Sequence, residues 1–385
     1  MSTINPLLKI GLQFIGVWPN VRYASVYRLI YILSILILQY FQYLYIYSHF
    51  KLSELPNLVD GLPVAIQYTL TASKLTALWI RRRVVYQVLT AMDDDWCVSM
   101  HVEQHLRMMA TKADKSHLLC NTVFSLTTIA GVLYLLGDYA FRFLHLAEDV
   151  NVSSRHFPVK IQFPFEQAEQ SPIYELLFII LFVHGMANTC TIATLDTLIA
   201  SLVLHASGQI DIICHELRKI SGDATFYESS MWRIGMLVER HNRVIKFSDK
   251  IHQISSIVTL MLVICNTLII VYFGFLIVIS VHGDTSIGLL VKAAFSCSVI
   301  LTEIFIFCFA GEYLSFKSTS IADAAYDSLW YDIPPNQSRM MSLMIMKSQR
   351  EITLTAGGLA NLSLETFTTI MKTSASYVSV MLAIY

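Results

Sequence analysis

Phe307–Tyr385 reads FCFAGEYLSFKSTSIADAAYDSLWYDIPPNQSRMMSLMIMKSQREITLTAGGLANLSLETFTTIMKTSASYVSVMLAIY. It holds three pieces in order. An apolar helix leaves the membrane at Gly311, and a polar Pro-Pro break is followed by a Met-rich amphipathic segment, 340–346. After Gly357 and Gly358, which we interpret as a hinge, one further apolar segment of membrane-spanning length ends the chain. The stretch predicts a helical membrane protein whose last helix follows a cytoplasmic connection.

The composition indicates that lipid is the main solvent of this chain. Of its 385 residues, 55% are apolar and 14% are charged, whereas soluble proteins have about 25% charged residues. The net charge of −1 argues against a protein that binds nucleic acid. The sequence contains no glycine-rich phosphate loop, HExxH or Gly-x-Ser-x-Gly motif. We therefore expect no enzyme, no cofactor and no metal site.

Seven apolar segments reach the length of about 20 residues that a bilayer requires. They are 27–47, 58–80, 118–141, 172–204, 254–280, 287–310 and 364–384. Lys and Arg concentrate before the first segment and after the second, fourth and sixth, most densely at Arg81, Arg82 and Arg83. Because positive loops stay in the cytoplasm, we expect an all-α membrane protein with seven transmembrane helices, a cytoplasmic N-terminus and an extracellular C-terminus. A G-protein-coupled receptor has the opposite topology.

Two apolar stripes extend beyond the membrane segments. One stripe follows the fourth segment and consists of Leu202, Ala206, Ile210, Ile213, Leu217 and Ile220. The other leads into the fifth segment and consists of Ile234, Leu237, Val244, Ile251 and Ile254. Their spacing is typical of helices packed in a bundle. We expect two helices of about 75 Å that build a cytoplasmic anchor body, and we expect Ile213, Leu217 and the segment 340–346 to join subunits. The alternative is separate loop helices.

The C-terminal stretch is similar to the C-terminal region of insect odorant receptors. The matching elements occur in the same order: Phe307-Cys308, Gly311-Glu312-Tyr313-Leu314, Tyr326, Ser328-Leu329-Trp330-Tyr331, Leu354-Thr355-Ala356-Gly357-Gly358, Ser363-Leu364-Glu365-Thr366-Phe367 and Ser376-Tyr377. The resemblance implies an odour-tuning subunit of a ligand-gated cation channel. It also implies a heterotetramer with the co-receptor Orco, in the plasma membrane of an olfactory neuron dendrite. The alternative is a gustatory-receptor-like channel that works as a homotetramer.

The resemblance assigns roles along the chain. We expect a cytoplasmic amphipathic N-terminus at 1–26, transmembrane helices 1 to 4 with the ligand-binding bundle at 27–204, and cytoplasmic anchor extensions at 205–253. We expect transmembrane helices 5 and 6 at 254–310, with part of helix 6 also belonging to the bundle. A cytoplasmic anchor segment at 311–358 and a pore-lining helix at 359–385 complete the chain.

The last helix carries the expected pore. Thr373, Ser376, Val380 and Ile384 follow steps of three, four and four and so share one face. In the family this helix lines a central pore, and the family's gate residues align with Val380 and Ile384, where an apolar ring can stop conduction. Ala383 departs from the family's pattern, since Orco carries glutamine there. The alternative is that Val380 and Ile384 contact lipid or neighbouring helices.

The resemblance also implies a small cavity in the outer half of the bundle, between the second, third, fourth and sixth spans. Aromatic and methionine side chains suit a small apolar or aromatic volatile ligand. The residues that we expect to bind it are Tyr68, Gly131, Tyr134, Leu135, Phe178, Phe182, Met186 and Phe295. The alternative for each is ordinary core packing. If Tyr134 and Phe178 form the wall, trimming either one should favour bulkier ligands.

The remaining polar features concern the membrane and the outer loops. Ionisable residues within the apolar segments are costly in lipid, and we expect them to pair, to reach the interface or to lie on an ion path; they are Lys74, His184, Asp196, Glu303 and Lys372. The sequon Asn151-Val152-Ser153 lies in an outer loop and predicts glycosylation of Asn151. No cysteine lies in an outer loop, so we expect no disulfide.

Overall fold

The computed structural model describes residues 3–19, 23–49, 55–145, 157–164, 168, 170–220, 227–282, 287–328 and 330–384. Within these ranges nearly the whole chain is helical. The elements are α1 (Pro6–Phe14), α2 (Ala24–Ser48), α3 (Leu55–Ile80), α4 (Arg82–Ser99), α5 (Glu103–His145), α6 (Ile173–Arg218), α7 (Tyr227–His282), α8 (Ile287–Asp327), α9 (Pro335–Ser348), β1 (Thr355–Ala356), β2 (Ala360–Asn361) and α10 (Leu364–Ile384).

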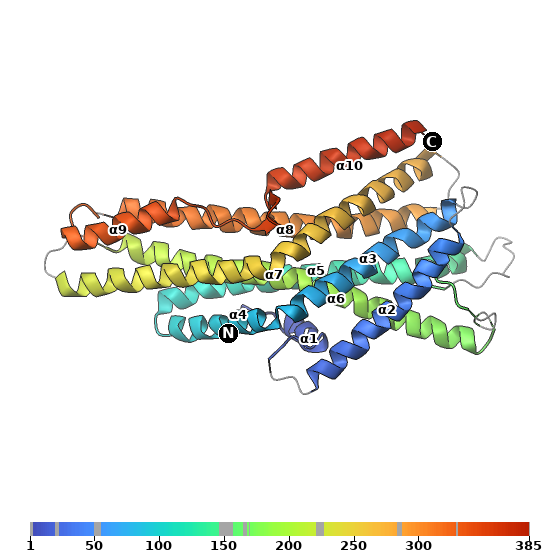
Figure 1. Ribbon diagram of the computed structural model, residues 1–385, viewed down its shortest axis with the longest axis horizontal. Helices are drawn as coiled ribbons and strands as arrows, with labels where there is room; N and C mark the ends of the chain where they lie inside the picture. The colour runs from blue at the N-terminus through green and yellow to red at the C-terminus, as the bar shows by residue number, and fades with distance from the viewer. Residues whose placement is uncertain are drawn as a thin grey trace.

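The helices form one elongated bundle (Figure 1). Its core is made by α5, α6, α7 and α8, which pack on one another. With 46 and 56 residues, α6 and α7 are about 69 Å and 84 Å long. This confirms the prediction of two long continuous helices, and separate loop helices are excluded there. The proposed boundaries 204/205 and 253/254 fall inside these helices.

The structure shows two further extensions that hydropathy did not predict. The apolar segments 118–141 and 287–310 are only parts of α5 and α8, which have 43 and 41 residues. Their continuations are more polar than the membrane segments and pack on α6. They complete the body at one end of the bundle, where α9 also lies (Figure 1). The opposite end holds the C-terminal half of α10.

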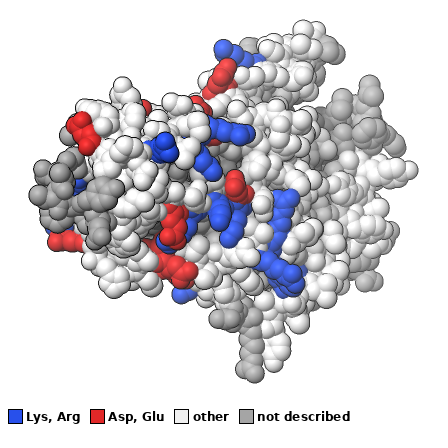
Figure 2. Space-filling view, turned by 60° about the vertical axis from the view of Figure 1, so that its left-hand side comes forward, with Lys and Arg blue, Asp and Glu red and all other residues white. Residues whose placement is uncertain are grey.

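Charge separates the two ends of the molecule. Figure 2 shows Lys, Arg, Asp and Glu gathered over the end that bears α9, whereas the part that recedes to the right is nearly free of them. Within the described residues, five helices are long and apolar enough to cross a membrane, and they belong to α2, α5, α6, α7 and α8. The more polar α3 and α10 have 26 and 21 residues, which is sufficient length to span a bilayer.

The N-terminal helix α1 is amphipathic, as the sequence predicted. Asn5 caps it by accepting a hydrogen bond from the Leu7 amide at 2.8 Å. Leu8 and Leu12 are fully buried on one side, and Ile10 is 61% exposed on the other. The helix packs on α5 and α6, so it is part of the folded body rather than a loose tail.

The two predicted stripes form the seam of the bundle inside one chain. Ile210, Ile213, Leu217 and Ile251 are 0% exposed, because α5, α7 and α8 of the same chain pack around α6. The expectation that Ile213 and Leu217 join subunits is therefore wrong. In α9 the segment 340–346 divides: Met341 and Met344 are buried, whereas Leu343 and Met346 are 60% and 64% exposed.

Gly357 and Gly358 form a tight hairpin turn, not the hinge that we expected. Their φ angles are 61° and 76°, and the Leu359 amide donates to the Ala356 carbonyl at 3.0 Å. Two successive positive φ angles are typical of the turn that joins short antiparallel strands. The Gly357 amide also donates to the Ser256 carbonyl of α7 at 2.9 Å. The hairpin β1–β2 is thus fastened to α7.

The residues that carry the C-terminal signature fix the start of α10. A side chain at Gly311 of α8 would collide with the Leu362 carbonyl, so glycine permits the close approach. The Leu364 amide lies 3.4 Å from its acceptor, a Glu312 carboxylate oxygen. Ser363 caps α10 by accepting from the Thr366 amide at 3.1 Å. The signature joins α8, the hairpin and α10.

Candidate functional site

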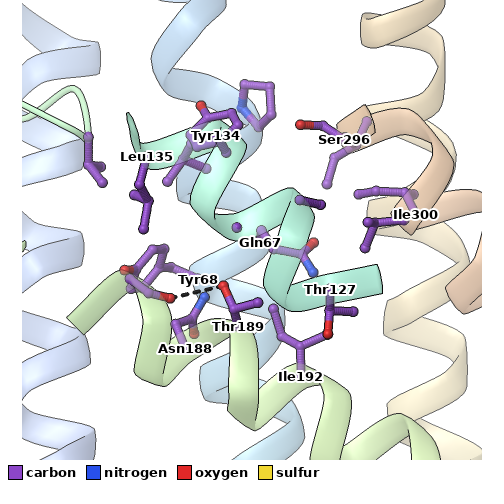
Figure 3. Close-up of a pocket in the computed structure, with 18 of the residues that line it drawn as sticks. Gln67, Tyr68, Thr127, Tyr134, Leu135, Asn188, Thr189, Ile192, Ser296 and Ile300 are labelled. Carbon is purple, nitrogen blue, oxygen red and sulfur yellow. Dashed lines mark hydrogen bonds between the residues drawn. The ribbon is translucent and has the colours of Figure 1, made fainter. Parts of the chain in front are cut away.

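A cavity of about 150 Å³ lies within the bundle, between α3, α5, α6, α7 and α8 (Figure 3). An apolar cavity of about this size can hold benzene. The residues around it are mainly apolar, with a few polar side chains: Pro63, Val64, Gln67, Tyr68, Thr127, Ala130, Gly131, Tyr134, Leu135, Val159, Gly185, Asn188, Thr189, Ile192, Ile269, Phe273, Ser296, Val299 and Ile300. Such a composition is typical of sites for small organic ligands.

The structure places four of the eight expected ligand residues in this wall. They are Tyr68 of α3 and Gly131, Tyr134 and Leu135 of α5. Glycine brings α5 and α6 together here, because a side chain at Gly185 would lie 2.8 Å from the Leu135 side chain. The cavity also involves α7, which the sequence did not place at the site.

The other four expected residues lie outside the wall. Phe178 packs edge-to-face on Tyr139, with ring centroids 4.9 Å apart. Phe182 and Met186 are half-buried side chains packed against the core, and Phe295 is 39% exposed. The neighbours of Met186 and Phe295, Gly185 of α6 and Ser296 of α8, line the cavity instead.

Helical phase explains the position of Met186, and distance along the helix explains that of Phe178. On α6 the wall consists of Gly185, Asn188, Thr189 and Ile192, which share one face at helical spacing. Met186 is turned about 100° from Gly185, since 3.6 residues make one turn. Phe178 is in phase with Gly185 but lies about two turns away along the helix. Choosing large aromatic side chains therefore missed positions where small residues leave the space.

A hydrogen-bonded chain fixes Tyr68 in the wall. Its hydroxyl and Nδ1 of His184 are 3.3 Å apart, and the two rings stack with centroids 5.7 Å apart. Nε2 of His184 lies 3.1 Å from Oγ of Ser34 in α2. Because its hydroxyl is held in this way, Tyr68 presents mainly an aromatic surface to the cavity.

Three of the ionisable residues predicted within the membrane pair with one another. Nζ of Lys74 in α3 donates to Oδ1 of Asp196 in α6 at 2.9 Å and to Oε1 of Glu303 in α8. Asn266 of α7 donates to Oε2 of Glu303 at 2.8 Å. All four are at most 3% exposed. Pairing therefore accounts for these three ionisable residues.

This buried ionic network lies below the cavity on the same helices. Lys74 follows Gln67 by seven residues, which is about 10 Å along α3. Asp196 follows Asn188 by eight residues on α6, and Glu303 follows Ser296 by seven on α8. The cavity and the network thus share α3, α6, α7 and α8.

The expected pore face of α10 points away from the rest of the chain. Ile370 and Ser374 are buried, and Gly274 of α7 faces Val378. Thr373, Ser376 and Val380 are exposed, and Val380 is 56% exposed. The side chain of Ile384 and the sequon residue Asn151 lie outside the described residues. The exposed face is available to neighbouring subunits, to a pore or to lipid.

The family model described as 7tm Odorant receptor matches residues 54–375 of this chain. The chain belongs to the odorant receptor family. This confirms the resemblance found at the C-terminus, and the expected class of receptor rather than enzyme.

Odorant receptors of Drosophila melanogaster are among its similar proteins. Odorant receptor 13a is 25% identical over 61% of this chain and 59% of its own length. Odorant receptor 22c is 25% identical over 56% of this chain and 54% of its own. These two alignments span less than two thirds of each relative. Odorant receptor 24a is 22% identical over 96% of this chain and 94% of its own.

Solved insect receptors have the same fold. The olfactory receptor OR5 from Machilis hrabei in complex with eugenol matches with a TM-score of 0.81 and 13% identity, over 98% of this chain and 97% of that one. OR5 in a second structure gives a TM-score of 0.79 and 15% identity over the same shares. The all-helical membrane fold with an anchor body is therefore the fold of insect odorant receptors.

The ligand-binding residues expected from the sequence of this odorant receptor did not include the polar side chains of the cavity wall. Gln67 Oε1 and Asn188 Oδ1 are buried and have no hydrogen-bond partner among the described residues. Thr127 and Thr189 donate to carbonyl oxygens one turn earlier in their own helices, at 2.8 Å and 3.0 Å. A signal for Gln67 existed, because a polar residue in the second apolar segment has to face the bundle interior.

Proposed function

We propose that this odorant receptor binds a small volatile molecule in the cavity between α3 and α5–α8, and that binding opens a cation pore. The cavity carries the proposal, because it is mainly apolar, is of the size of one aromatic ring and contains polar groups without partners. That OR5 of the same fold was solved with eugenol supports a small organic ligand here. The expected pocket residues Tyr68, Gly131, Tyr134 and Leu135 belong to this site.

Helix α7 offers a route from the ligand to the pore. Ile269 and Phe273 of α7 contribute to the cavity wall. The next residue, Gly274, faces Val378 of α10, and the hairpin before α10 is bonded to α7 through Ser256. A ligand that shifts α7 therefore shifts α10 as well. We propose that Thr373, Ser376, Val380 and Ile384 face a non-selective cation pore, with Val380 and Ile384 as its gate.

The pore requires several subunits. We propose a heterotetramer with the co-receptor Orco in the plasma membrane of an olfactory neuron dendrite, with seven membrane-spanning helices and a cytoplasmic N-terminus. The exposed side of α9, with Leu343 and Met346, is the proposed contact between anchor bodies. It replaces the buried stripe of α6 in this role. Asn151 remains the proposed glycosylation site of the outer loop.

The test is a panel of volatile molecules applied to cells that express this chain with Orco, recorded as cation current. We expect a ligand-dependent current that is lost when Tyr68→Trp fills the cavity, while surface expression is kept. Met186→Trp, beside the wall on α6, serves as the matched control. The absence of ligand-evoked current with the whole panel would contradict the proposal. Equal current without Orco would instead indicate a homotetramer of the gustatory-receptor type.

A further inference from the structure

We propose that the cavity selects ligands that carry a hydroxyl group, such as small alcohols and phenols, over hydrocarbons and ethers of equal size. This inference rests on the proposed function, since it concerns the ligand of the same cavity. Four polar side chains in the wall carry it: Gln67, Thr127, Asn188 and Thr189 (Figure 3).

The two threonines can only accept a hydrogen bond from a ligand. The Thr127 hydroxyl donates its hydrogen to the Val123 carbonyl, and the Thr189 hydroxyl donates to the Gly185 carbonyl. A hydroxyl has one hydrogen but two acceptor lone pairs. With the hydrogen used inside the helix, each oxygen still offers a lone pair. Ethers and hydrocarbons have no hydrogen to donate to it.

The two amides are the wall groups that most need a partner. Within the part of the chain that the structure describes, Oδ1 of Asn188 and Oε1 of Gln67 are buried without a hydrogen-bond partner, and Asn188 is only 5% exposed. A buried acceptor without a partner is unfavourable. Whichever way an amide is turned, it can bond to a hydroxyl, because a hydroxyl both donates and accepts. An ether can satisfy only the amide nitrogen.

The rest of the wall limits the ligand to a neutral, compact molecule. None of the described residues that line the cavity is Asp, Glu, Lys, Arg or His, so an ionised ligand would have no counter-charge among them. The aromatic surfaces of Tyr68 and Phe273 and the aliphatic side chains of Leu135 and Ile300 form apolar walls. A volume of about 150 Å³ favours one ring, or a short chain, that bears a single polar group.

The experiment compares compounds matched in size. Benzyl alcohol and anisole are isomers, and toluene has the same ring without oxygen; 1-hexanol, dipropyl ether and heptane form a second set. Half-maximal concentrations are measured from the cation current of the chain expressed with Orco. We expect each alcohol to act at a concentration about 10- to 100-fold lower than its partners, as one satisfied buried group implies. Simple partitioning into lipid would give the opposite order.

Variants assign the preference to the wall. Asn188→Leu and Gln67→Met should each reduce the advantage of the alcohols over toluene about tenfold. Met186→Leu, on α6 outside the wall, should keep both that advantage and the response to toluene. The inference is wrong if the ethers or hydrocarbons act at concentrations as low as the alcohols do. It is also wrong if the double variant Asn188→Leu with Gln67→Met keeps the preference for alcohols. In both cases the proposed receptor function stands. Silence towards both sets, with current evoked by other volatiles, also overturns the inference, whereas silence towards every volatile overturns the proposed function itself.

Discussion

Lys74 is the cation of the buried ionic network inside the bundle. Its ammonium group is shared by two buried carboxyl groups, those of Asp196 and Glu303. Removing one partner from a buried ionic group costs about 3–5 kcal/mol. We therefore expect Lys74→Met to abolish most surface expression, measured by labelling of intact cells. A control, Lys372→Met on the exposed face of α10, should reach the surface normally.

The two carboxyl groups of this network should differ in their tolerance to substitution. One cation faces two carboxyl groups, so the site is neutral when one of them holds a proton. Glu303 accepts from Lys74 and, at 2.8 Å, from Asn266, whereas Asp196 accepts from Lys74 at 2.9 Å. Glu303 is thus the better-stabilised anion. We expect Asp196→Asn to keep most surface expression and Glu303→Gln to lose it. Equal losses would contradict this assignment.

Trimming the cavity wall should change the size of the preferred ligand. Tyr134 lies in the wall, so Tyr134→Ala enlarges the cavity and should move the preference towards bulkier volatiles. Phe178 packs on Tyr139 away from the wall, so Phe178→Ala should keep the odour order. Concentration–response curves over a homologous series, at equal surface expression, provide the measurement. A shift with Phe178→Ala but not with Tyr134→Ala would show that the ligand sits elsewhere.

At the scale of single residues, the sequence predicted the type of site, an apolar cavity, better than it predicted the individual residues that line the cavity. Tyr68, Gly131, Tyr134 and Leu135 were expected and lie in the wall. The positions of Asn188 and Thr189 depend on how α6 is rotated about its axis. That rotation is set by packing against α5, where Leu135 approaches Gly185. A single sequence shows the helical period but not which side faces the cavity.

At the scale of elements, the hairpin β1–β2 holds the start of α10, the proposed pore helix, against α7. Gly357 and Gly358 both have positive φ angles, which are unfavourable for other residues by about 1–2 kcal/mol. A side chain added at Gly357 would lie 2.6 Å from the Leu260 side chain, whereas one added at Gly358 would meet no described atom within 4 Å. We expect Gly357→Ala to lower the melting temperature more than Gly358→Ala does. Thermal unfolding of the purified receptor provides the test, and equal shifts would mean that the Leu260 contact is unimportant.

The long helices show what hydropathy predicts and what it misses. The stripes of α6 and α7 are apolar throughout, so they predicted continuous helices beyond the membrane. The added lengths of α5 and α8 are held partly by polar contacts: Lys112 of α5 pairs with Asp211 of α6 at 2.7 Å, and Lys317 of α8 pairs with the same carboxylate at 2.7 Å. Such charged positions resemble a solvated loop in a sequence. Their partners become known only from the packed structure.

At the scale of the whole molecule, the proposed assembly requires the anchor body to provide a surface for other subunits. The apolar stripe of α6 is already covered by helices of the same chain, since Ile210 and Ile213 are fully buried. Leu343 and Met346 of α9 instead lie three residues apart on one exposed face. Apolar area contributes about 25 cal/mol per Å² when it is removed from water. The proposed topology places α9 in the cytoplasm, away from lipid, so a partner subunit is the proposed cover for these side chains.

Charging this face should therefore prevent assembly without unfolding the chain. We expect Leu343→Glu with Met346→Glu to lose co-purification with Orco, and with it the ligand-evoked current, because two carboxylates cannot be buried between subunits without partners. Val98→Glu with Met100→Glu is the matched control, since these residues near the end of α4 are also apolar and are 50% and 54% exposed. The control pair should co-purify with Orco as the unaltered chain does. Intact complexes from the α9 pair would place the subunit contact elsewhere on the anchor body.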